Sequence, residues 1–271
     1  MFSSLTYVIM LIILIIILTF LNLEYYDFYY DDVIFKSKIM INSIFDSFVN
    51  NNLLDKPTNK NNKFAIVTFE NRNELEFVNL HNKNVTEYCN KWNYEYLFYN
   101  QCIHNVYWCK LFFVLDAIKT GKYDYVMWMD SDTIIKNINF NLDLIVNKYN
   151  SDIFVSLDNG YSAFCAGVFI IKNSPIGISF LEDCINSKLD KCIIRNENKL
   201  KGLYSGLCYE EGIMNKLIFE KYYKYTTCLP KYYVYTDKIT PNNKLCDFDT
   251  FILHLGMSDN NLRAKCFNRY I

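Results

Sequence analysis

Two carboxylates one residue apart follow an apolar run in this chain. Residues 123–129, YDYVMWM, are mostly aromatic or aliphatic, and such a run predicts a buried strand. Asp130 and Asp132 come directly after it, with Ser131 between them. Ionised carboxylates at the end of a buried strand need a partner or a cation, because burying an unpaired charge is costly. The pattern indicates a Mg²⁺ or Mn²⁺ site, since these ions prefer oxygen ligands and share them with substrate phosphates.

The same residues also fit a simpler interpretation. Asp and Ser are common in turns, and Asp-x-Asp alone is a weak motif. The preceding strand favours the metal site, because ligands bind at the carboxyl ends of the strands in open α/β sheets.

Three further places in the sequence are candidates to complete such a site. Ala166 and Gly167 lead into an apolar run, where a glycine either lets a ligand approach the backbone or simply packs. His254 stands near the end of a short apolar segment, and Arg263 and Lys265 follow. A divalent cation held by carboxylates and an imidazole would bind a diphosphate, and the basic side chains would neutralise the departing group. A single histidine on a strand is more often structural, so only its context favours His254.

The segments around these residues alternate between two patterns. Short apolar or alternating runs predict strands near residues 64–69, 94–99, 123–130, 152–157, 162–174 and 250–256. Helical patterns lie near residues 75–92, 106–118, 142–149, 175–184 and 210–219. This alternation predicts an α/β fold with a mostly parallel sheet and helices on both faces. We expect residues 188–206 to form a surface loop and the residues after 256 a polar tail.

Length and composition bound the domain organisation. The chain has 271 residues, of which 51% are hydrophobic, enough for one anchor segment and one domain of about 200 residues. The formal net charge is −1, so nothing in the bulk charge favours binding to nucleic acid. We divide the chain into a short tail and membrane anchor (1–23), a stem or linker (24–62) and a catalytic domain (63–271).

The anchor is predicted from an uncharged stretch. Residues 5–23 contain no charged side chain and are long enough to span a bilayer core. No basic region precedes them and no small-residue cleavage site follows, so we expect a single-pass signal anchor that is not removed. Lys36 and Lys38 lie after the segment, which by itself would keep the rest of the chain cytosolic. The sequon Asn84-Val85-Thr86 is weak support for the opposite, lumenal orientation.

The ten cysteines include no Cys-x-x-Cys pair, which disfavours a zinc ribbon or a redox motif. Their even number suits disulfides in an oxidising compartment. Free buried thiols are an equally good interpretation, and the spacing does not decide the pairing.

Five segments taken together resemble glycosyltransferase family 34, a group of galactosyl-, mannosyl- and xylosyltransferases. They are residues 88–96, 108–111, 128–132, 166–174 and 251–256, and the resemblance spans roughly residues 63–266. It implies a GT-A fold with a Rossmann-like sheet, in a type II membrane enzyme of the Golgi or ER lumen. It also implies transfer of a hexose or pentose from a UDP- or GDP-linked sugar to a glycan or glycoprotein acceptor, with retention to give an α-linkage.

The resemblance implies roles for single residues as well. Asp130, Asp132 and His254 would hold Mn²⁺ (or Mg²⁺), with Asp132 as the firmer ligand. The candidates for contact with the nucleotide sugar are Thr68, Phe69, Lys110, Asp130, Ser131, Ala166, Gly167, Arg263 and Lys265. The catalytic candidates are Glu210, Glu211 and, more weakly, Asp158.

The chain departs from the family pattern at three points. Cys165 stands where the family often has Asn, and Glu211 stands where an amide usually follows the acid. The basic residue expected after His254 is not obvious, with Arg263 the first candidate and Lys265 the second.

These departures leave a membrane-tethered, catalytically inactive glycan-binding protein of the same fold as an alternative. Within the enzyme class, a glycogenin-like glucosyltransferase or an initiating α-mannosyltransferase is the nearest rival. A Ca²⁺-binding structural protein is remote, because the chain lacks a loop with multiple oxygen ligands.

Overall fold

The computed structural model describes residues 62–157, 162–188, 192, 200–202, 204–236 and 246–271. The expected anchor, the expected stem apart from its last residue Asn62, the candidate Asp158 and most of the expected loop at 188–206 lie outside these residues. None of the helices in the described ranges is both long and apolar enough to cross a membrane.

The core of the fold is a six-stranded sheet with the order β2-β1-β3-β6-β5-β7. The strands are β1 (Phe64–Phe69), β2 (Glu95–Tyr99), β3 (Tyr125–Met129), β5 (Ile153–Leu157), β6 (Phe164–Lys172) and β7 (Thr226–Leu229). Strand β1 pairs in parallel with β2 and β3, and β5 pairs in parallel with β7. The predicted α/β class and parallel-rich sheet are confirmed.

Strand β6 is the exception, because it runs antiparallel to both of its neighbours. Eight of its nine residues are buried, so its sequence lacks the alternation that marks a half-exposed strand. The antiparallel direction brings the start of β6 beside the end of β3, where Met129 pairs with Val168. The backbone N–H of Asp130 then donates to the carbonyl of Gly167 at 2.8 Å.

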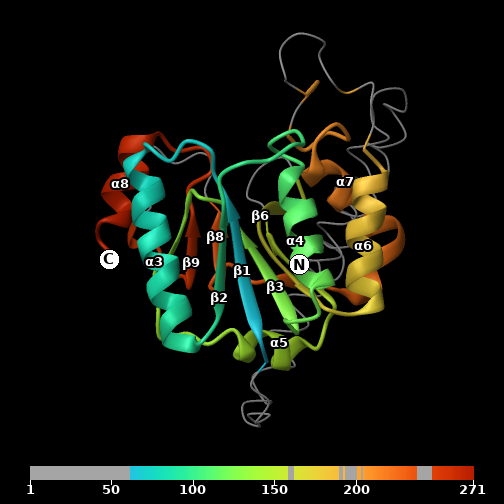
Figure 1. Cartoon of the computed structure of the whole chain (residues 1–271), viewed down its shortest axis with the longest axis horizontal. Coiled ribbons are helices and arrows are strands. Elements are labelled where there is room, and N and C mark those ends of the chain that lie inside the picture. Colours follow the sequence, from blue (N-terminus) through green and yellow to red (C-terminus); the bar gives the residue numbers. More distant parts are fainter. Residues whose placement is uncertain (1–61, 158–161, 189–191, 193–199, 203, 237–245) are drawn as a thin grey trace, which may run out of the picture. The chain divides into compact units, whose positions relative to one another are not determined.

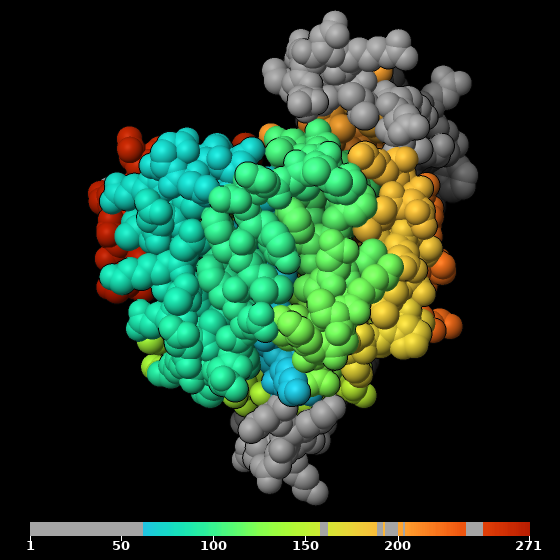
Figure 2. Space-filling model, in the orientation of Figure 1, coloured from blue at the N-terminus to red at the C-terminus, as the bar shows by residue number. Residues whose placement is uncertain are grey.

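Helices cover both faces of the sheet. They are α3 (Glu76–Trp92), α4 (Cys109–Lys119), α5 (Asp143–Tyr149), α6 (Pro175–Asn186) and α7 (Glu210–Leu217), which continues into a π-helical turn (Ile218–Tyr222) and a 3₁₀ turn (Tyr223–Tyr225). Phe64 and Ile66 pack with Val85 and Tyr88 of α3, so their neighbours in β1 face the other side, where α4 packs. In Figure 1, α3 and α4 flank the central strands. The segments from α3 to α4 form the near surface in Figure 2.

A second, three-stranded sheet was not anticipated from the sequence as a unit. It consists of β4 (Thr133–Ile135), β9 (Ile252–His254) and β8 (Val234–Thr236), with β9 in the middle. Strand β4 begins directly after Asp132, and Thr133 pairs with His254. This sheet therefore carries the second aspartate to the histidine.

The expected polar tail is wrong, because residues Asn260–Phe267 form helix α8. The side chain of Asp259 caps its first turn by accepting from the Leu262 N–H at 2.9 Å. The helix buries Arg263, Ala264, Cys266 and Phe267 and packs against α3. It therefore holds Arg263 in the interior.

Both interpretations of the cysteines apply. Three disulfides join Cys102 to Cys109, Cys192 to Cys208 and Cys246 to Cys266. The free cysteines in the described part of the chain are Cys89, Cys165, Cys184 and Cys228.

The sequon at Asn84 is not available for glycosylation in the folded domain. Asn84 is 0% exposed. Its amide donates to the carbonyls of Ile135 at 3.0 Å and Tyr270 at 3.2 Å, and its oxygen accepts from the Ile135 N–H at 2.8 Å. The side chain is a structural link, so the sequon no longer supports a lumenal orientation.

Candidate metal centre and its surroundings

Asp130 and Asp132 flank a tight turn between β3 and β4. The N–H and the hydroxyl of Thr133 both donate to the Asp130 carbonyl, at 3.1 and 2.7 Å. The segment therefore forms a turn, and the same turn places both carboxylates beside His254. One ligand atom from each of Asp130, Asp132 and His254 lies within 4.8 Å of the other two.

His254 is oriented by the two strands beside it. Its Nε2 lies 3.1 Å from Oδ1 of Asp132, and its Nδ1 lies 3.3 Å from Oγ1 of Thr236 and 3.5 Å from Sγ of Cys165. Burial alone would lower the pKa of His254, but Cys165 and Asp132 outweigh burial and raise that pKa. A bound cation would replace the Nε2 proton, while Thr236 would still fix the ring through Nδ1.

Asp132 has a buried oxygen that fits a cation. Oδ2 accepts from Nη2 of Arg263 at 3.0 Å. Oδ1 accepts no hydrogen bond from the described residues, although it lies at ion-pair distance from His254. Burial would raise the pKa of Asp132, but His254 and Arg263 outweigh it and hold that pKa well below its usual range. A buried ionised oxygen that faces an imidazole suits a divalent cation, because both groups can bind the same ion.

Two glycines make room for the imidazole. A Cβ on Gly167 would lie 2.2 Å from Cε1 of His254, and one on Gly256 would lie 3.1 Å from Nε2. The first distance is far inside van der Waals contact. The space beside Gly167 is therefore filled by His254. Of the two interpretations of this glycine, packing is the correct one.

Arg263 is a scaffold for this centre. It is 8% exposed, and its Nη2 donates to Asp132 and to the Gly256 carbonyl at 3.0 and 2.9 Å. Nε donates to the Leu255 carbonyl at 3.1 Å and Nη1 to Asn260 at 3.2 Å. Each nitrogen of the guanidinium is thus already engaged. Lys265, two residues further along α8, is exposed, and the structure does not bring it to Asp132.

Lys110 joins the aspartates to the second acidic pair. Its buried ammonium lies 3.2 Å from Oδ1 of Asp130 and 2.9 Å from Oε1 of Glu210, and it donates to the Ala166 carbonyl at 3.2 Å. Burial would lower the pKa of Lys110, but Asp130 and Glu210 outweigh burial and raise that pKa. The lysine therefore stays charged between the two pairs.

Glu210 and Glu211, in the first turn of α7, have different surroundings. Glu211 is fully engaged, because its oxygens accept from the Ser162 hydroxyl at 2.6 Å and from the Ala166 N–H at 3.1 Å. Oε2 of Glu210 is buried and has no partner among the described residues. Burial raises the pKa of Glu210, and Lys110 offsets this only in part.

Thr68, Phe69 and Ser131, the remaining candidates for contact with the nucleotide sugar, all contact other parts of the protein. Thr68 is 0% exposed, and its hydroxyl donates to the Met129 carbonyl at 2.9 Å, so it ties β1 to β3. Phe69 is partly buried and packs against Phe113. Ser131 donates to Oε2 of Glu70 at 2.7 Å.

Sequence reasoning missed Glu70 and Arg72. Glu70 is 5% exposed, and Arg72 binds it through Nε at 2.8 Å and Nη2 at 2.7 Å. The sequence pattern that could have identified them is two charged residues just after the predicted strand 64–69, at the edge of the sheet where ligands bind.

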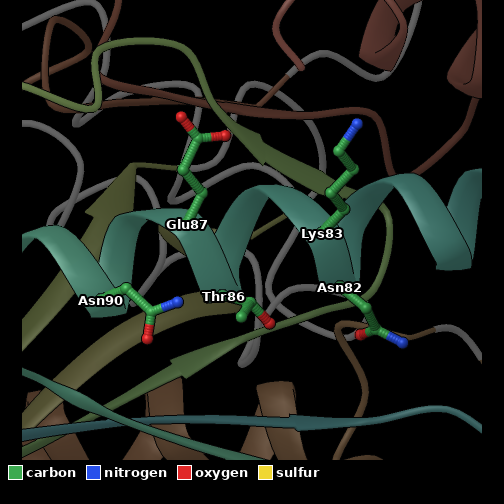
Figure 3. Close-up of a pocket in the computed structure, with 5 residues that line it drawn as sticks. All are labelled: Asn82, Lys83, Thr86, Glu87 and Asn90. Carbon is green, nitrogen blue, oxygen red and sulfur yellow. The ribbon is translucent and has the colours of Figure 1, made fainter.

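A surface pocket lies apart from these residues. It is lined by five side chains from successive turns of α3, namely Asn82, Lys83, Thr86, Glu87 and Asn90 (Figure 3). None of the candidate site residues lines it.

Comparison with known families confirms the resemblance to glycosyltransferase family 34. The model of the galactosyl transferase GMA12/MNN10 family matches residues 58–148, which include Asp130 and Asp132. Galactomannan galactosyltransferase 1 from Cyamopsis tetragonoloba is 28% identical over an alignment of 102 residues, which covers 33% of this chain. The match spans only 23% of that relative's length.

One solved structure shows a shared fold. A glycosyltransferase involved in the glycosylation of the major capsid of PBCV-1 has a TM-score of 0.57 at 13% identity, covering 76% of this chain and 99% of that one. The glycosyltransferase GlyE of Streptococcus pneumoniae TIGR4 has a TM-score of 0.45 at 14% identity, covering 77% of this chain and 60% of that one.

Proposed function

We propose that this chain is a metal-dependent glycosyltransferase with a GT-A fold. It transfers a hexose or pentose from a UDP- or GDP-linked sugar to a glycan or glycoprotein acceptor, with retention to give an α-linkage. The observation that carries the proposal is the cluster of Asp130, Asp132 and His254, in which one buried Asp132 oxygen faces, among the described residues, only the imidazole of His254, at 3.1 Å. The family match and the shared fold support sugar transfer as the reaction class.

In this proposal the metal site stabilises the leaving diphosphate. Asp130, Asp132 and His254 would hold Mn²⁺ or Mg²⁺, which supplies Lewis-acid stabilisation of the diphosphate when bound. Arg263 keeps Asp132 ionised and fixed, and Thr236 orients His254 from the opposite ring nitrogen. The chain thus presents a preformed set of ligands, and the reaction does not have to assemble them.

Glu210 is the favoured group beside the donor sugar. Its unpaired Oε2 can accept from a sugar hydroxyl or stabilise positive charge that develops at the anomeric carbon. Lys110 holds the other oxygen of Glu210 at 2.9 Å and fixes the carboxylate. Glu211 is already bonded to Ser162 and Ala166, so it shapes the site through those contacts.

The proposal includes a place in the cell. We propose a single-pass type II protein anchored by residues 1–23, with its catalytic domain in the Golgi or ER lumen. The three disulfides support this location, because disulfides form and persist in oxidising compartments.

Donor hydrolysis tests the proposed reaction. The full-length chain would be incubated with individual UDP- and GDP-sugars and Mn²⁺, and release of the nucleoside diphosphate would be measured. We expect release from one donor, and loss of that release in Asp132→Ala. Asp247→Ala is a matched control, since its side chain is 68% exposed and pairs only with Arg269 among the ion pairs described.

The alternative of an inactive glycan-binding protein predicts a different result. In that case no donor would release a nucleoside diphosphate, and calorimetry would detect no nucleotide binding. Release in both the wild type and Asp132→Ala would contradict the assignment of the metal centre.

A further inference from the structure

The basic side chains expected to face a diphosphate are already bound to the protein's own groups. Arg263 uses its three nitrogens on Asp132, Asn260 and two backbone carbonyls. Lys110 is enclosed by Asp130, Glu210 and the Ala166 carbonyl. Both residues stabilise the acidic groups of the site, and both are buried, with every nitrogen already bound to a protein group.

Arg72 has the exposure that these two residues lack. Its side chain is 55% exposed, whereas the Glu70 carboxylate that holds it is 5% exposed. Nε donates to Oε1 at 2.8 Å and Nη2 to Oε2 at 2.7 Å, and the Arg72 backbone N–H also donates to Oε1 at 3.0 Å. Nη1 has no hydrogen-bond partner within the part of the chain that the structure describes. The guanidinium is thus fixed along one edge and open along another.

Glu70 connects Arg72 to the turn between the two aspartates. The oxygen of Glu70 that binds Nη2 of Arg72 also accepts from the Ser131 hydroxyl at 2.7 Å. Arg72 is therefore two hydrogen bonds away from the residue between Asp130 and Asp132. The pKa of Arg72 is raised mainly by Glu70 and also by the charge of Asp132, which agrees with a place at the rim of the metal centre.

We propose that Arg72 contacts the diphosphate of the nucleotide sugar, and that Glu70 positions it. This inference rests on the proposed function and adds a binding residue to it. A guanidinium suits phosphate oxygens because its donors lie in one plane and can bind two oxygens together. Anchoring by a buried carboxylate lowers the entropy lost when the ligand binds. Glu70 also keeps Arg72 from pairing with the aspartates, which leaves them available to a cation.

An ordinary surface ion pair is the rival explanation. Such pairs contribute little, because both side chains remain solvated and mobile. Glu70 differs from this case because it is buried and shared with Ser131. Arg269 provides the matched control, as it pairs with the exposed Asp247 at 2.8 Å and its own side chain is 39% exposed.

The experiment compares Arg72→Ala, Arg72→Lys and Arg269→Ala in the full-length chain. Calorimetry in Mn²⁺ would measure binding of UDP and GDP, and of inorganic pyrophosphate, which has neither base nor ribose. We expect Arg72→Ala to weaken both the preferred nucleoside diphosphate and pyrophosphate by about ten- to a hundredfold, the range for a lost charged hydrogen bond. Arg72→Lys should recover part of the loss, and Arg269→Ala should match the wild type. Thermal unfolding would show that each variant is folded.

Two outcomes would overturn the inference. Unchanged binding of both ligands in a folded Arg72→Ala variant would make the Glu70 pair purely structural. Weaker nucleotide binding with unchanged pyrophosphate binding would place Arg72 against the base or ribose. Failure of the proposed function is recognised separately, because the wild type would then release no nucleoside diphosphate from any donor.

Discussion

Asp130 and Asp132 at the end of β3 and Glu210 and Glu211 at the start of α7 are two acidic pairs joined by Lys110. In the first pair, Asp132 has a histidine and an arginine beside it. In the second pair, Glu210 has only the lysine as a positive neighbour among the described ion pairs, and Glu211 is held by uncharged donors.

The comparison shows that negative charge alone does not mark the acid that meets a ligand. One member of each pair, Asp132 or Glu210, keeps a buried oxygen that accepts no hydrogen bond from the described residues, and the Asp132 oxygen faces only the His254 imidazole. Such an oxygen is costly unless a ligand satisfies it. Glu211 is the same type of residue and is nearly as buried, yet both of its oxygens accept hydrogen bonds. We therefore expect three very different responses to the same change from acid to amide.

The largest effect is expected for Asp132→Asn. The amide keeps the shape of the side chain but removes the charge that a cation needs, so donor hydrolysis should fall about a thousandfold or more. Calorimetric titration with Mn²⁺ should show weaker metal binding. Asp130→Asn should have the smaller effect of the two, because Asp130 is more exposed (29% against 17% for the side chains). Equal Mn²⁺ affinity in Asp132→Asn and the wild type would contradict the first half of the comparison.

An intermediate effect is expected for Glu210→Gln. Donor hydrolysis should fall about a hundredfold, because the variant loses a charge placed to stabilise the transition state. Mn²⁺ affinity should not change, since Glu210 lies across Lys110 from the aspartates. The melting temperature should fall, because the buried ammonium of Lys110 loses one of its two anionic partners. A parallel loss of metal binding would show that the two pairs act as one site.

The smallest effect is expected for Glu211→Gln. Its remaining oxygen can still accept from the Ala166 N–H, and the Ser162 hydroxyl can rotate to accept from the new amide. We expect less than a tenfold change in donor hydrolysis and a change of about 1 kcal/mol or less in the free energy of unfolding, measured by urea denaturation. A loss as large as that of Glu210→Gln would mean that Glu211 meets the substrate directly.

The sequence predicted the strands and helices that have a clear period. The runs at β1, β2, β3 and β5 were located closely, and so were α3, α5 and α6. The direction of β6 was beyond this kind of reasoning, because a strand buried on both faces looks the same in either direction. Strands β4 and β8 have three residues each, which is too short to establish a period.

The metal ligands of the candidate site could be predicted because their residue types alone identify them. The Asp-x-Asp pair and His254 lie together, as expected from the type of ligand each offers. The roles of Arg263 and Lys265 could not be separated, because the contact between Arg263 and Asp132 joins residues 131 positions apart and depends on an unexpected helix. Glu211 and Glu210 are indistinguishable in sequence, since their difference lies in the donors that surround them.

The imidazole held between two glycines has a consequence for how this sequence can vary over time. As long as position 254 is histidine, position 167 has almost no freedom, because any side chain there would occupy the volume of the ring, whereas a Cβ at position 256 would lie 3.1 Å from the ring and require a small shift. Loss of the histidine removes both constraints at once. A descendant that carried alanine at position 167 would therefore record that its lineage had already given up this imidazole.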